Sequence, residues 1–392
     1  MKKQKIIFFF LFVAFVIGGL AIYGVQANDT TSRKIVIFQA GVADTAKDNI
    51  ISKAGGVKLK DLDLVKGQVV WLSNKAVEKL AKQPGVLRVE DDIVVQALGK
   101  VAPPQPSQVL PWGINRIDAE NVWVDNNADS IKVGIIDTGI SNTHPDLLIN
   151  IKGGVNTIQA LNGWNDDNGH GSHVAGIVAA LNNSIGVVGA GPDIHLYAIK
   201  VLNRNGSGWI SDIIEGLQWA IDHNMQVVNL SLGASTGNQS FHNAIIATKN
   251  AGIVVVAAAG NSGGSVIYPA AYPEVIAVSA TDQTDTLAKF SSRGPEVDLA
   301  APGVSIYSTY KGTAYATLSG TSMASPHVAG SAALLLFASL ANSSLCDTIT
   351  VDGKCDPDEV QAKLQATAVD LGAAGFDNLY GFGLVNAFAA VQ

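Results

Sequence analysis

Residues 131–139 read Ile-Lys-Val-Gly-Ile-Ile-Asp-Thr-Gly, an apolar run with little polar alternation that ends in an acidic residue. Four similar runs lie at residues 196–201, 226–230, 253–258 and 275–279. Three candidate helices lie at residues 172–181, 211–223 and 243–251. Apolar strands separated by helices are typical of a parallel sheet that is buried on both faces. The sequence therefore predicts an α/β fold with a doubly wound, mostly parallel sheet flanked by helices, in which ligands bind at the carboxyl ends of the strands.

A smaller unit is expected before this sheet. Its predicted order is strand, helix, strand, strand, helix and strand, at residues 34–38, 44–54, 57–64, 68–72, 74–83 and 86–90. This βαββαβ order predicts a ferredoxin-like α+β domain. Residues 28–98 carry 11 Lys and Arg against 9 Asp and Glu, whereas residues 99–392 carry 12 against 24, so the two units also differ in charge. The Pro-rich residues 99–107 fit an exposed linker between the units.

The N-terminus has the pattern of an export signal. Three lysines precede an apolar run at residues 6–25, and Val25-Gln26-Ala27 supplies small residues at the positions that a signal peptidase reads. Residues 1–27 are therefore predicted to be a signal peptide, so that the mature protein is secreted, is extracellular and meets a membrane only transiently. An uncleaved membrane anchor is the alternative, because about twenty apolar residues suffice to span a bilayer.

Composition excludes several classes of protein. The 392 residues are 47% hydrophobic and 15% charged, which is too apolar for a disordered chain. A net charge of −7 argues against nucleic-acid binding, which needs clustered Lys and Arg. The two cysteines, Cys346 and Cys355, are too few for a disulfide scaffold or a four-thiolate metal site. In an exported protein they can form a disulfide that closes a hairpin over residues 348–354, and two free thiols are the alternative.

Asp137 ends the first apolar run, at the sheet edge where ligands are expected. An acidic residue at a strand end can also be a structural cap or a metal ligand. Asp137-Thr-Gly is, in addition, the signature of aspartic proteases, which need a second carboxylate that shares a proton with the first. The chain contains no second Asp-Thr-Gly or Asp-Ser-Gly motif.

His170 lies between two glycines in the segment Asn-Gly-His-Gly-Ser-His-Val-Ala-Gly at residues 168–176, immediately before a predicted helix. Glycine on both sides lets the backbone and a substrate approach the imidazole. The alternatives are a metal pair formed with His173 or a structural histidine. No glutamate within the motif completes a metalloprotease site.

Ser322 follows Gly320-Thr321 at the start of an apolar helix, with Pro326 in a position that the first helical turn tolerates. The N-terminus of a helix presents unpaired N–H groups to an anion. Without the other two motifs, a serine at this position would be interpreted as an ordinary N-cap.

These three motifs, in the order Asp, His, Ser, resemble those of the subtilisin-like serine proteases. The resemblance covers residues 108–392 as the catalytic domain, and residues 28–98 resemble the inhibitory propeptide of that family. It implies a monomeric, secreted endopeptidase whose partners are polypeptide substrates and, as an intramolecular inhibitor, its own propeptide. The resemblance also implies that the precursor cleaves itself after Leu98.

The family resemblance implies a role for each motif residue. Ser322 would attack the scissile carbonyl, His170 would accept and return the proton, and Asp137 would stabilise the imidazolium. Asn261 would donate to the oxyanion, although its Gly-Asn-Ser-Gly context is also turn chemistry. Ser172 stands where the family usually has Thr, and it retains the hydroxyl. The alternatives are a catalytically inactive exported binding module and an aspartic-type protease that uses Asp137.

Two Gly-containing segments match the family's strands that flank the substrate, and an extended peptide can pair with such edges. The walls of the first pocket carry no acidic residue, and Ile267 is expected near its base, which predicts a preference for medium-sized apolar side chains. Leu202, Trp209 and Ile210 would shape a second apolar pocket. The expected substrate-binding residues are Gly206, Ser207, Gly208, Ile210, Ser231, Leu232, Gly233, Ala258, Gly260 and Ile267.

Residues 181–187 resemble the calcium loop of the same family. The implied ligands are the side chains of Gln108, Asp146 and Asn183 and the carbonyls of Leu181, Ile185 and Val187. These are hard oxygen ligands of the kind that a structural Ca²⁺ ion takes. The alternative is a simple helix-ending turn. A weaker cation site is expected near Ala270, Tyr272 and Val275.

Overall fold

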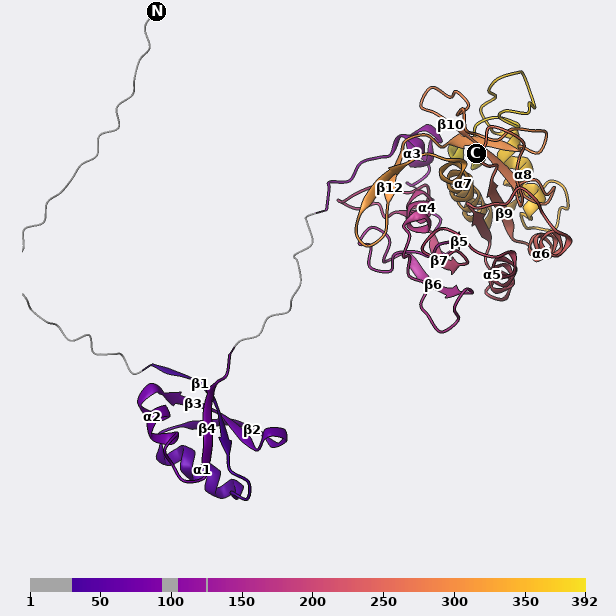
Figure 1. The fold of residues 1–392 in the computed structure, drawn as a ribbon. Helices are drawn as coiled ribbons and strands as arrows, with labels where there is room; N and C mark the ends of the chain where they lie inside the picture. Colours follow the sequence, from indigo (N-terminus) through magenta and orange to yellow (C-terminus); the bar gives the residue numbers. More distant parts are fainter. Residues whose placement is uncertain (1–29, 94–104, 125) are drawn as a thin grey trace, which may run out of the picture. The chain divides into compact units, whose positions relative to one another are not determined.

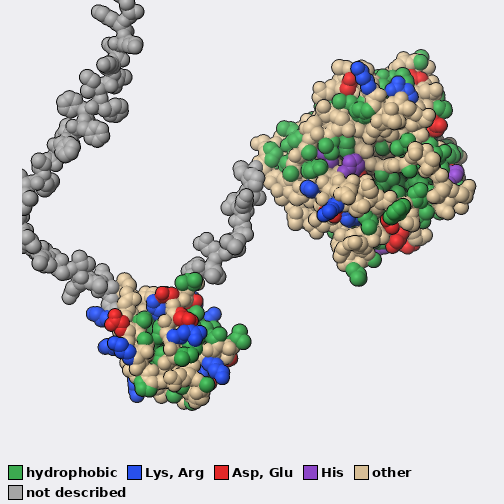
Figure 2. All heavy atoms as spheres, viewed as in Figure 1, with side chains coloured by type: hydrophobic (Ala, Val, Ile, Leu, Met, Phe, Trp, Pro, Cys, Tyr) green, Lys and Arg blue, Asp and Glu red, His purple; other side chains and the backbone are tan. Residues whose placement is uncertain are grey.

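The computed structural model describes residues 30–93, 105–124 and 126–392. The predicted signal peptide, the processing residue Leu98 and most of the Pro-rich segment lie outside these residues. The chain divides into two compact units between residues 102 and 103 (Figure 1). Figure 2 shows many Lys and Arg side chains on the visible face of the smaller unit, whereas the visible face of the larger unit is mostly uncharged.

The smaller unit is a four-stranded antiparallel sheet with two helices, and its βαββαβ order confirms the prediction. Its elements are β1 (Thr31–Phe38), α1 (Asp44–Lys53), β2 (Val57–Leu62), β3 (Gly67–Ser73), α2 (Asn74–Leu80) and β4 (Val86–Asp91). The strands lie in the order β2-β3-β1-β4. Ile51 and Leu80 of the helices pack with Val36, Val70 and Leu72 in one apolar core. The helices therefore cover one face of the sheet.

The larger unit is built on a seven-stranded sheet in the order β11-β10-β9-β8-β5-β7-β6. All of its strand pairs are parallel, which confirms the predicted fold class. The strands are β5 (Lys132–Asp137), β6 (Ile151–Asn156), β7 (His195–Lys200), β8 (Val227–Leu230), β9 (Val254–Ala258), β10 (Ile276–Thr281) and β11 (Leu299–Pro302). A separate antiparallel hairpin consists of β12 (Ile306–Thr309) and β13 (Tyr315–Leu318).

Helices cover both faces of this sheet. The helices are α3 (Trp112–Arg116), α4 (His170–Ala179), α5 (Ile210–Asp222), α6 (Gln239–Asn250), α7 (Thr321–Ala341), α8 (Pro357–Ala366) and α9 (Ala387–Ala390). Alternate residues of one strand enter different cores, because successive side chains of a strand point to opposite faces. Val254 and Val256 pack with α4 and α7, whereas Val255 packs with α5 and α6. Both faces are therefore buried, as the unbroken apolar runs predict.

α7 is the central helix of one core. Among the described residues it is the one helix long and apolar enough to cross a membrane, but 72% of its most apolar stretch is buried inside the larger unit. A helix that is apolar all round is expected in the core of a large domain. Its composition is thus explained by packing against the sheet.

The loop between the two cysteines differs from the prediction. Cys346 and Cys355 form a disulfide, but the segment between them contains no strand, so the predicted hairpin is wrong. The backbone N–H groups of residues 348–350 instead donate to one carboxylate oxygen of the buried Glu359, at 2.7–3.0 Å. A carboxylate that gathers three consecutive amides favours a concave loop over a ladder of paired strands.

Candidate active site

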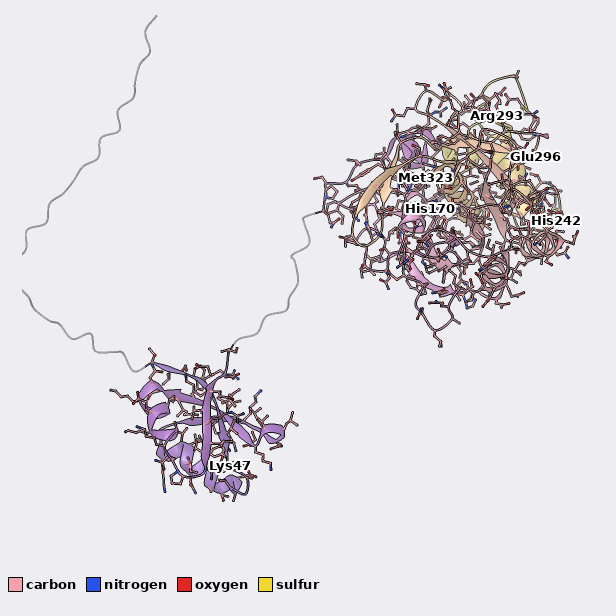
Figure 3. The ribbon with its side chains drawn as sticks, viewed as in Figure 1. Lys47, His170, His242, Arg293, Glu296 and Met323 are labelled. Atoms are coloured by element: carbon pink, nitrogen blue, oxygen red, sulfur yellow. A yellow bond between two sulfur atoms is a disulfide. The ribbon has the colours of Figure 1, made fainter. Side chains whose placement is uncertain are left out.

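Asp137 and His170 meet where β5 ends and α4 begins. Nδ1 of His170 lies 2.8 Å from Oδ1 and 2.9 Å from Oδ2 of Asp137. The Asp137 carboxylate is fully buried and also accepts the backbone N–H of Thr138 at 2.7 Å. The side chain of His170 is 27% exposed. Figure 3 labels this residue in the larger unit. The buried carboxylate orients the imidazole so that its other nitrogen, Nε2, is left for a further partner.

The two glycines beside His170 allow this contact. Gly169 is the N-cap of α4 and has φ = +118°, a conformation that disfavours other residues. A Cβ on residue 171 would lie 2.2 Å from the carbonyl oxygen of Gly139 and 3.1 Å from the Cβ of Asp137. Only glycine therefore lets the first turn of α4 approach the end of β5 this closely.

The pKa of His170 is raised above its usual value. Burial alone would lower this pKa, but the charge of Asp137, its hydrogen bond to the ring and the charge of Asp166 together outweigh burial. An imidazole with a raised pKa is a stronger base and is stabilised when it carries a proton. The pair can therefore accept a proton from a nearby hydroxyl.

Ser322 lies in the first turn of α7 and is linked to the end of β8. Its hydroxyl donates to the carbonyl oxygen of Ser231 at 3.1 Å, and the hydroxyl of Ser231 donates to the carbonyl of Ser322 at 2.8 Å. The Ser322 hydroxyl thus bonds Ser231 rather than His170. Ser231 and His170 line the same groove, so the three predicted residues converge on one region. Catalytic hydrogen bonds often tighten only when substrate binds.

Asn261 lies beside the start of α7. Its side-chain oxygen accepts the N–H of Thr321 at 2.9 Å and the hydroxyl of Thr321 at 3.0 Å. A Cβ on Gly320 would lie 3.3 Å from the amide nitrogen of Asn261 and 3.7 Å from the backbone nitrogen of Ser322. The amide nitrogen of Asn261 and the backbone nitrogen of Ser322 therefore both lie close to Gly320.

A groove of about 520 Å³ runs past His170. Of the predicted substrate-binding residues, Gly206, Ser207, Gly208, Ile210, Ser231, Leu232 and Gly233 line it. The groove has further lining residues that the sequence motifs did not indicate, which are Thr138, Asn168, Ile213, Ala234, Phe241 and Tyr268. Phe241 and Tyr268 belong to no motif, and only their aromatic character could have suggested a pocket. The described lining residues include no Asp, Glu, Lys or Arg, and His170 is the one imidazole among them.

The predicted substrate-binding residues Ala258, Gly260 and Ile267 are not among the residues that line this groove. A Cβ on Gly233 would lie 2.6 Å from Cδ1 of Ile267, and a Cβ on Gly260 would lie 3.1 Å from its Cγ1. The Ile267 side chain therefore occupies the space between the segments that carry these two glycines. This placement limits the depth available to a side chain that enters between them.

His173 does not pair with His170 around a metal. Its Nε2 lies 3.1 Å from the carbonyl oxygens of both Ile306 and Ala316, so this nitrogen carries the proton. Burial lowers the pKa of His173 to about 4, and the ring is neutral at ordinary pH. The described residues contain no group of three or more His, Cys, Asp or Glu that could hold a metal ion. His173 is thus a structural histidine of the core.

Several of the predicted calcium ligands contact one another. Asn183 donates its amide to Oδ1 of Asp146 at 2.8 Å, and the N–H of Val187 donates to Oδ2 at 2.9 Å. Gln108 donates its amide to the carbonyl of Leu181 at 3.2 Å. Backbone N–H groups of residues 108 and 109 donate to the carbonyls of Ser184 and Gly186.

The charge of this cluster suits a cation. Asp146 is fully buried, and its described partners are amides and the hydroxyl of Tyr315, with no Lys or Arg among them. Burial raises the pKa of Asp146 above its usual value. A buried, unpaired carboxylate is costly unless a cation accompanies it. A half-turn of the Gln108 amide would present an oxygen atom in place of its N–H groups. The residues therefore fit Ca²⁺.

The aspartic-protease interpretation of Asp137 finds no support in these contacts. In the described chain, the hydrogen-bond partners of the Asp137 carboxylate are the His170 ring and the Thr138 amide. That mechanism requires two carboxyl groups that share one proton. The carboxylate is instead committed to the imidazole.

Comparison with known proteins agrees with this geometry. The profile of a family described as the subtilase family, a peptidase family, matches residues 128–383. The chain is 39% identical over 407 aligned residues to subtilisin E of Bacillus subtilis, with both chains fully covered. It is 43% identical over 325 residues to an alkaline protease of Alkalihalobacillus alcalophilus, covering 82% of this chain and 78% of the relative. A thermostable alkaline protease of Halalkalibacterium halodurans is also 43% identical, over 327 residues.

Proposed function

Because this chain belongs to the subtilase family and is a serine endopeptidase, we propose that it cleaves polypeptides with Asp137, His170 and Ser322 as its triad. The observation that carries the proposal is the contact of the buried Asp137 carboxylate with Nδ1 of His170 at 2.8 Å. His170 lines the groove together with Ser231, and Ser231 accepts a hydrogen bond from the Ser322 hydroxyl.

In the proposed mechanism the Ser322 hydroxyl leaves its bond to Ser231 and donates to Nε2 of His170. His170 accepts the proton as Ser322 Oγ attacks the scissile carbonyl, and it returns that proton to the leaving amine. The Asp137 carboxylate stabilises the imidazolium throughout. Water then hydrolyses the acyl-enzyme with His170 again acting as the base.

The developing oxyanion would be held by two donors, the side-chain amide of Asn261 and the backbone N–H of Ser322. The Asn261 side-chain oxygen accepts two hydrogen bonds from Thr321, which orients the amide nitrogen away from that residue. A donor that is held in place before the reaction stabilises the transition state without a cost of reorganisation.

Broad specificity with an apolar preference is proposed for the first pocket. The described groove lining has no charged partner for a substrate Lys or Arg, and Ile267 fills the space between Gly233 and Gly260. Medium-sized apolar side chains should therefore be favoured over large or basic ones. Leu202, Ile210 and Phe241 supply apolar contact further along the groove.

Export and self-processing complete the proposal. Residues 1–27 would direct secretion, residues 28–98 would serve as an inhibitory propeptide, and cleavage after Leu98 would release the catalytic domain at residues 108–392 with its linker. The monomeric mature enzyme would act outside the cell on polypeptides. The pattern of the N-terminal residues and the βαββαβ unit at residues 31–91 support this organisation.

A structural Ca²⁺ ion is proposed for the loop at residues 181–187. Gln108, Asp146 and Asn183 would bind it through their side chains, and Leu181, Ile185 and Val187 through their carbonyls. The ion would neutralise the buried charge of Asp146 and stabilise the folded loop. It takes no part in the proposed chemistry.

One set of assays tests the enzymatic proposal against its alternatives. Hydrolysis of casein at neutral to alkaline pH should be abolished by a fluorophosphonate and by Ser322→Ala. The label should map to Ser322, and the Ser322→Ala precursor should remain uncut at Leu98. Activity at acid pH that resists the fluorophosphonate would indicate an aspartic mechanism. A folded protein that neither cleaves casein nor takes up the label would indicate a binding module.

A further inference from the structure

Asp166, four residues before His170, is a buried carboxylate with an unusually complete set of donors. It is 3% exposed, and its two oxygens accept five hydrogen bonds. The donors are the Thr138 hydroxyl at 2.9 Å, the N–H groups of Asn168 and Gly169 at 2.9 and 2.8 Å, and the N–H and hydroxyl of Ser172 at 2.9 and 2.6 Å. One carboxylate thus binds both ends of the turn that carries His170.

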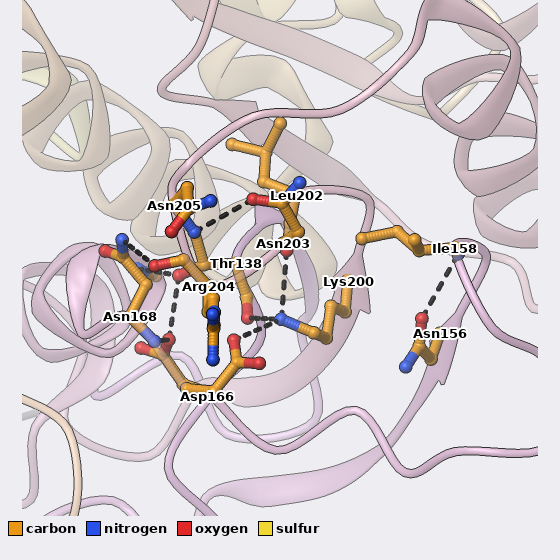
Figure 4. Close-up of polar contacts among 12 residues, drawn as sticks. Thr138, Asn156, Ile158, Asp166, Asn168, Lys200, Leu202, Asn203, Arg204 and Asn205 are labelled. Atoms are coloured by element: carbon orange, nitrogen blue, oxygen red, sulfur yellow. Dashed lines mark hydrogen bonds and ion pairs between the residues drawn. The ribbon is translucent and has the colours of Figure 1, made fainter.

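Thr138 connects this carboxylate to the end of β5. Its hydroxyl donates to Asp166 and accepts the N–H of Gly171 at 2.9 Å. On the other side, the carbonyl of Thr138 accepts the ammonium of Lys200 at 2.6 Å, as Figure 4 shows. Lys200 is 5% exposed and also bonds the carbonyl of Leu202 and the carboxylate of Asp167. Thr138, which directly follows Asp137, is therefore bonded both through its side chain and through its backbone carbonyl.

The charged and titratable groups around His170 come from five segments of the chain. Asp137 ends β5, Asp166 lies in the loop before α4, and His173 lies one turn further along α4. Lys200 of β7 faces Thr138, and the ring of Tyr310, after β12, lies against Gly169. The negative charge of Asp166 acts in the same direction as that of Asp137 on the pKa of His170, and both raise it.

We propose that Asp166 is a positioning residue for catalysis: it fixes the Asp137 strand end and the His170 turn in one geometry and supplies a second negative charge for the imidazole. The proposal rests on the proposed proteolytic function. Asp166 touches neither substrate groove nor nucleophile, so its effect passes through Thr138 and the first turn of α4. A small misplacement of reacting groups can reduce a rate by about 10²-fold.

Asp166→Asn tests the proposal, with Asp129→Asn as the control. Asparagine retains one acceptor oxygen. Its side-chain NH2 group, however, faces the Ser172 N–H, which it cannot accept, and the side chain carries no charge. We expect kcat of Asp166→Asn to fall about 10- to 100-fold with little change in KM. The acid limb of the kcat/KM profile should move to lower pH, because a lower pKa leaves His170 neutral at lower pH. Asp129→Asn should retain the parental rate and profile, because the exposed carboxylate of Asp129 contacts His195 at the start of β7 and is not part of the network around Thr138 and the His170 turn.

Thr138→Val separates position from charge. It removes the hydroxyl that joins Asp166 to Gly171 but keeps the Asp166 charge, so kcat should fall while the acid limb stays in place. An Asp166→Asn enzyme with the parental kcat, or with a reduced kcat and an unmoved acid limb, would overturn the proposal. If Asp166→Asn does not fold, Thr138→Val with the parental kcat would overturn it. Failure of the parent protein to react with the fluorophosphonate would instead refute the proteolytic function itself.

Discussion

Gly171 brings the first turn of α4 into contact with Asp137 at the end of β5. A Cβ on residue 171 would lie 3.1 Å from both the Cβ and the Oδ1 of Asp137. The hydrogen bond between Asp137 and His170 therefore depends on a missing side chain next to the histidine. This close approach of two elements carries the first prediction.

Gly171→Ala should reduce kcat/KM by about 10²-fold or more, because the added methyl group separates α4 from β5 and displaces His170 from Asp137. Gly163→Ala is the matched control, since a Cβ there would meet nothing within 4 Å. Steady-state kinetics on a peptide substrate measure both variants. A Gly171→Ala enzyme as active as Gly163→Ala would contradict the role assigned to the contact.

Two buried histidines should make stability depend on pH. Burial lowers the pKa of both His173 and His327 to about 4, below the value of about 6.5 in an unfolded chain. Between these pKa values the unfolded state binds more protons than the folded state. Each histidine should therefore lower the free energy of unfolding by up to about 1.4 kcal/mol for each pH unit as the pH falls from 6.5 to 4. Asp298 acts in the opposite direction, because burial raises its pKa to about 6.

A variant isolates the contribution of one histidine. In the Ser322→Ala background, which avoids self-digestion, His327→Gln should reduce the slope of Tm against pH between 6.5 and 4. Glutamine retains a donor for the carbonyl of Met323 but does not titrate. Differential scanning calorimetry provides the measurement, and an unchanged slope would show that His327 does not titrate as described.

Removal of Ca²⁺ should lower the melting temperature of the Ser322→Ala protein. A ligand present at about 100 times its Kd stabilises a fold by about 2.7 kcal/mol. Each kcal/mol of stability changes the melting temperature of a large domain by about 2–4 °C. Asp146→Asn should abolish the difference between calcium and chelator. Asp193→Asn is the control, because burial also raises the pKa of Asp193 but this residue lies outside the predicted ligand set. Equal melting of the parent with and without chelator would refute the calcium site.

The disulfide should stabilise the loop around Glu359. Replacing Cys346 and Cys355 together with serine should cost about 2–3 kcal/mol, as expected for a loop of this length. Hydrogen exchange should increase at the amides of residues 348–350, because the closed loop holds them on the Glu359 carboxylate. Casein hydrolysis should continue at the parental rate at room temperature. Unchanged exchange at these amides would show that the carboxylate alone orders the loop.

Shortening Ile267 should enlarge the first pocket. Ile267→Ala removes the atoms that lie between Gly233 and Gly260 and should raise kcat/KM for Phe relative to Leu about 10-fold or more. Competing peptide substrates that differ only at the residue before the cleaved bond measure this ratio. A Leu preference that survives the substitution would place the first pocket elsewhere in the groove.

Five strands of the large sheet could be predicted from their unbroken apolar runs, because a strand buried on both faces leaves that pattern in its own residues. The two edge strands could not. β6 contains the pair Gly153-Gly154, and β11 ends in Pro302, and both residue types are depleted in strands. The predicted hairpin between the cysteines failed for a different reason, since the amides of residues 348–350 bond the carboxylate of Glu359 in the following helix.

The motifs around Asp137, His170 and Ser322 are local and could be recognised in the linear chain, together with their order. The contacts between them could not be derived from local sequence, because 33 residues separate Asp137 from His170 and the packing of α4 against the end of β5 brings them together. The same holds for the bond from Ser322 to Ser231, which lies 91 residues away. Burial and turn chemistry are visible in local sequence. Contacts between distant segments form only when the packing of the whole domain offsets the entropic cost of closing long loops.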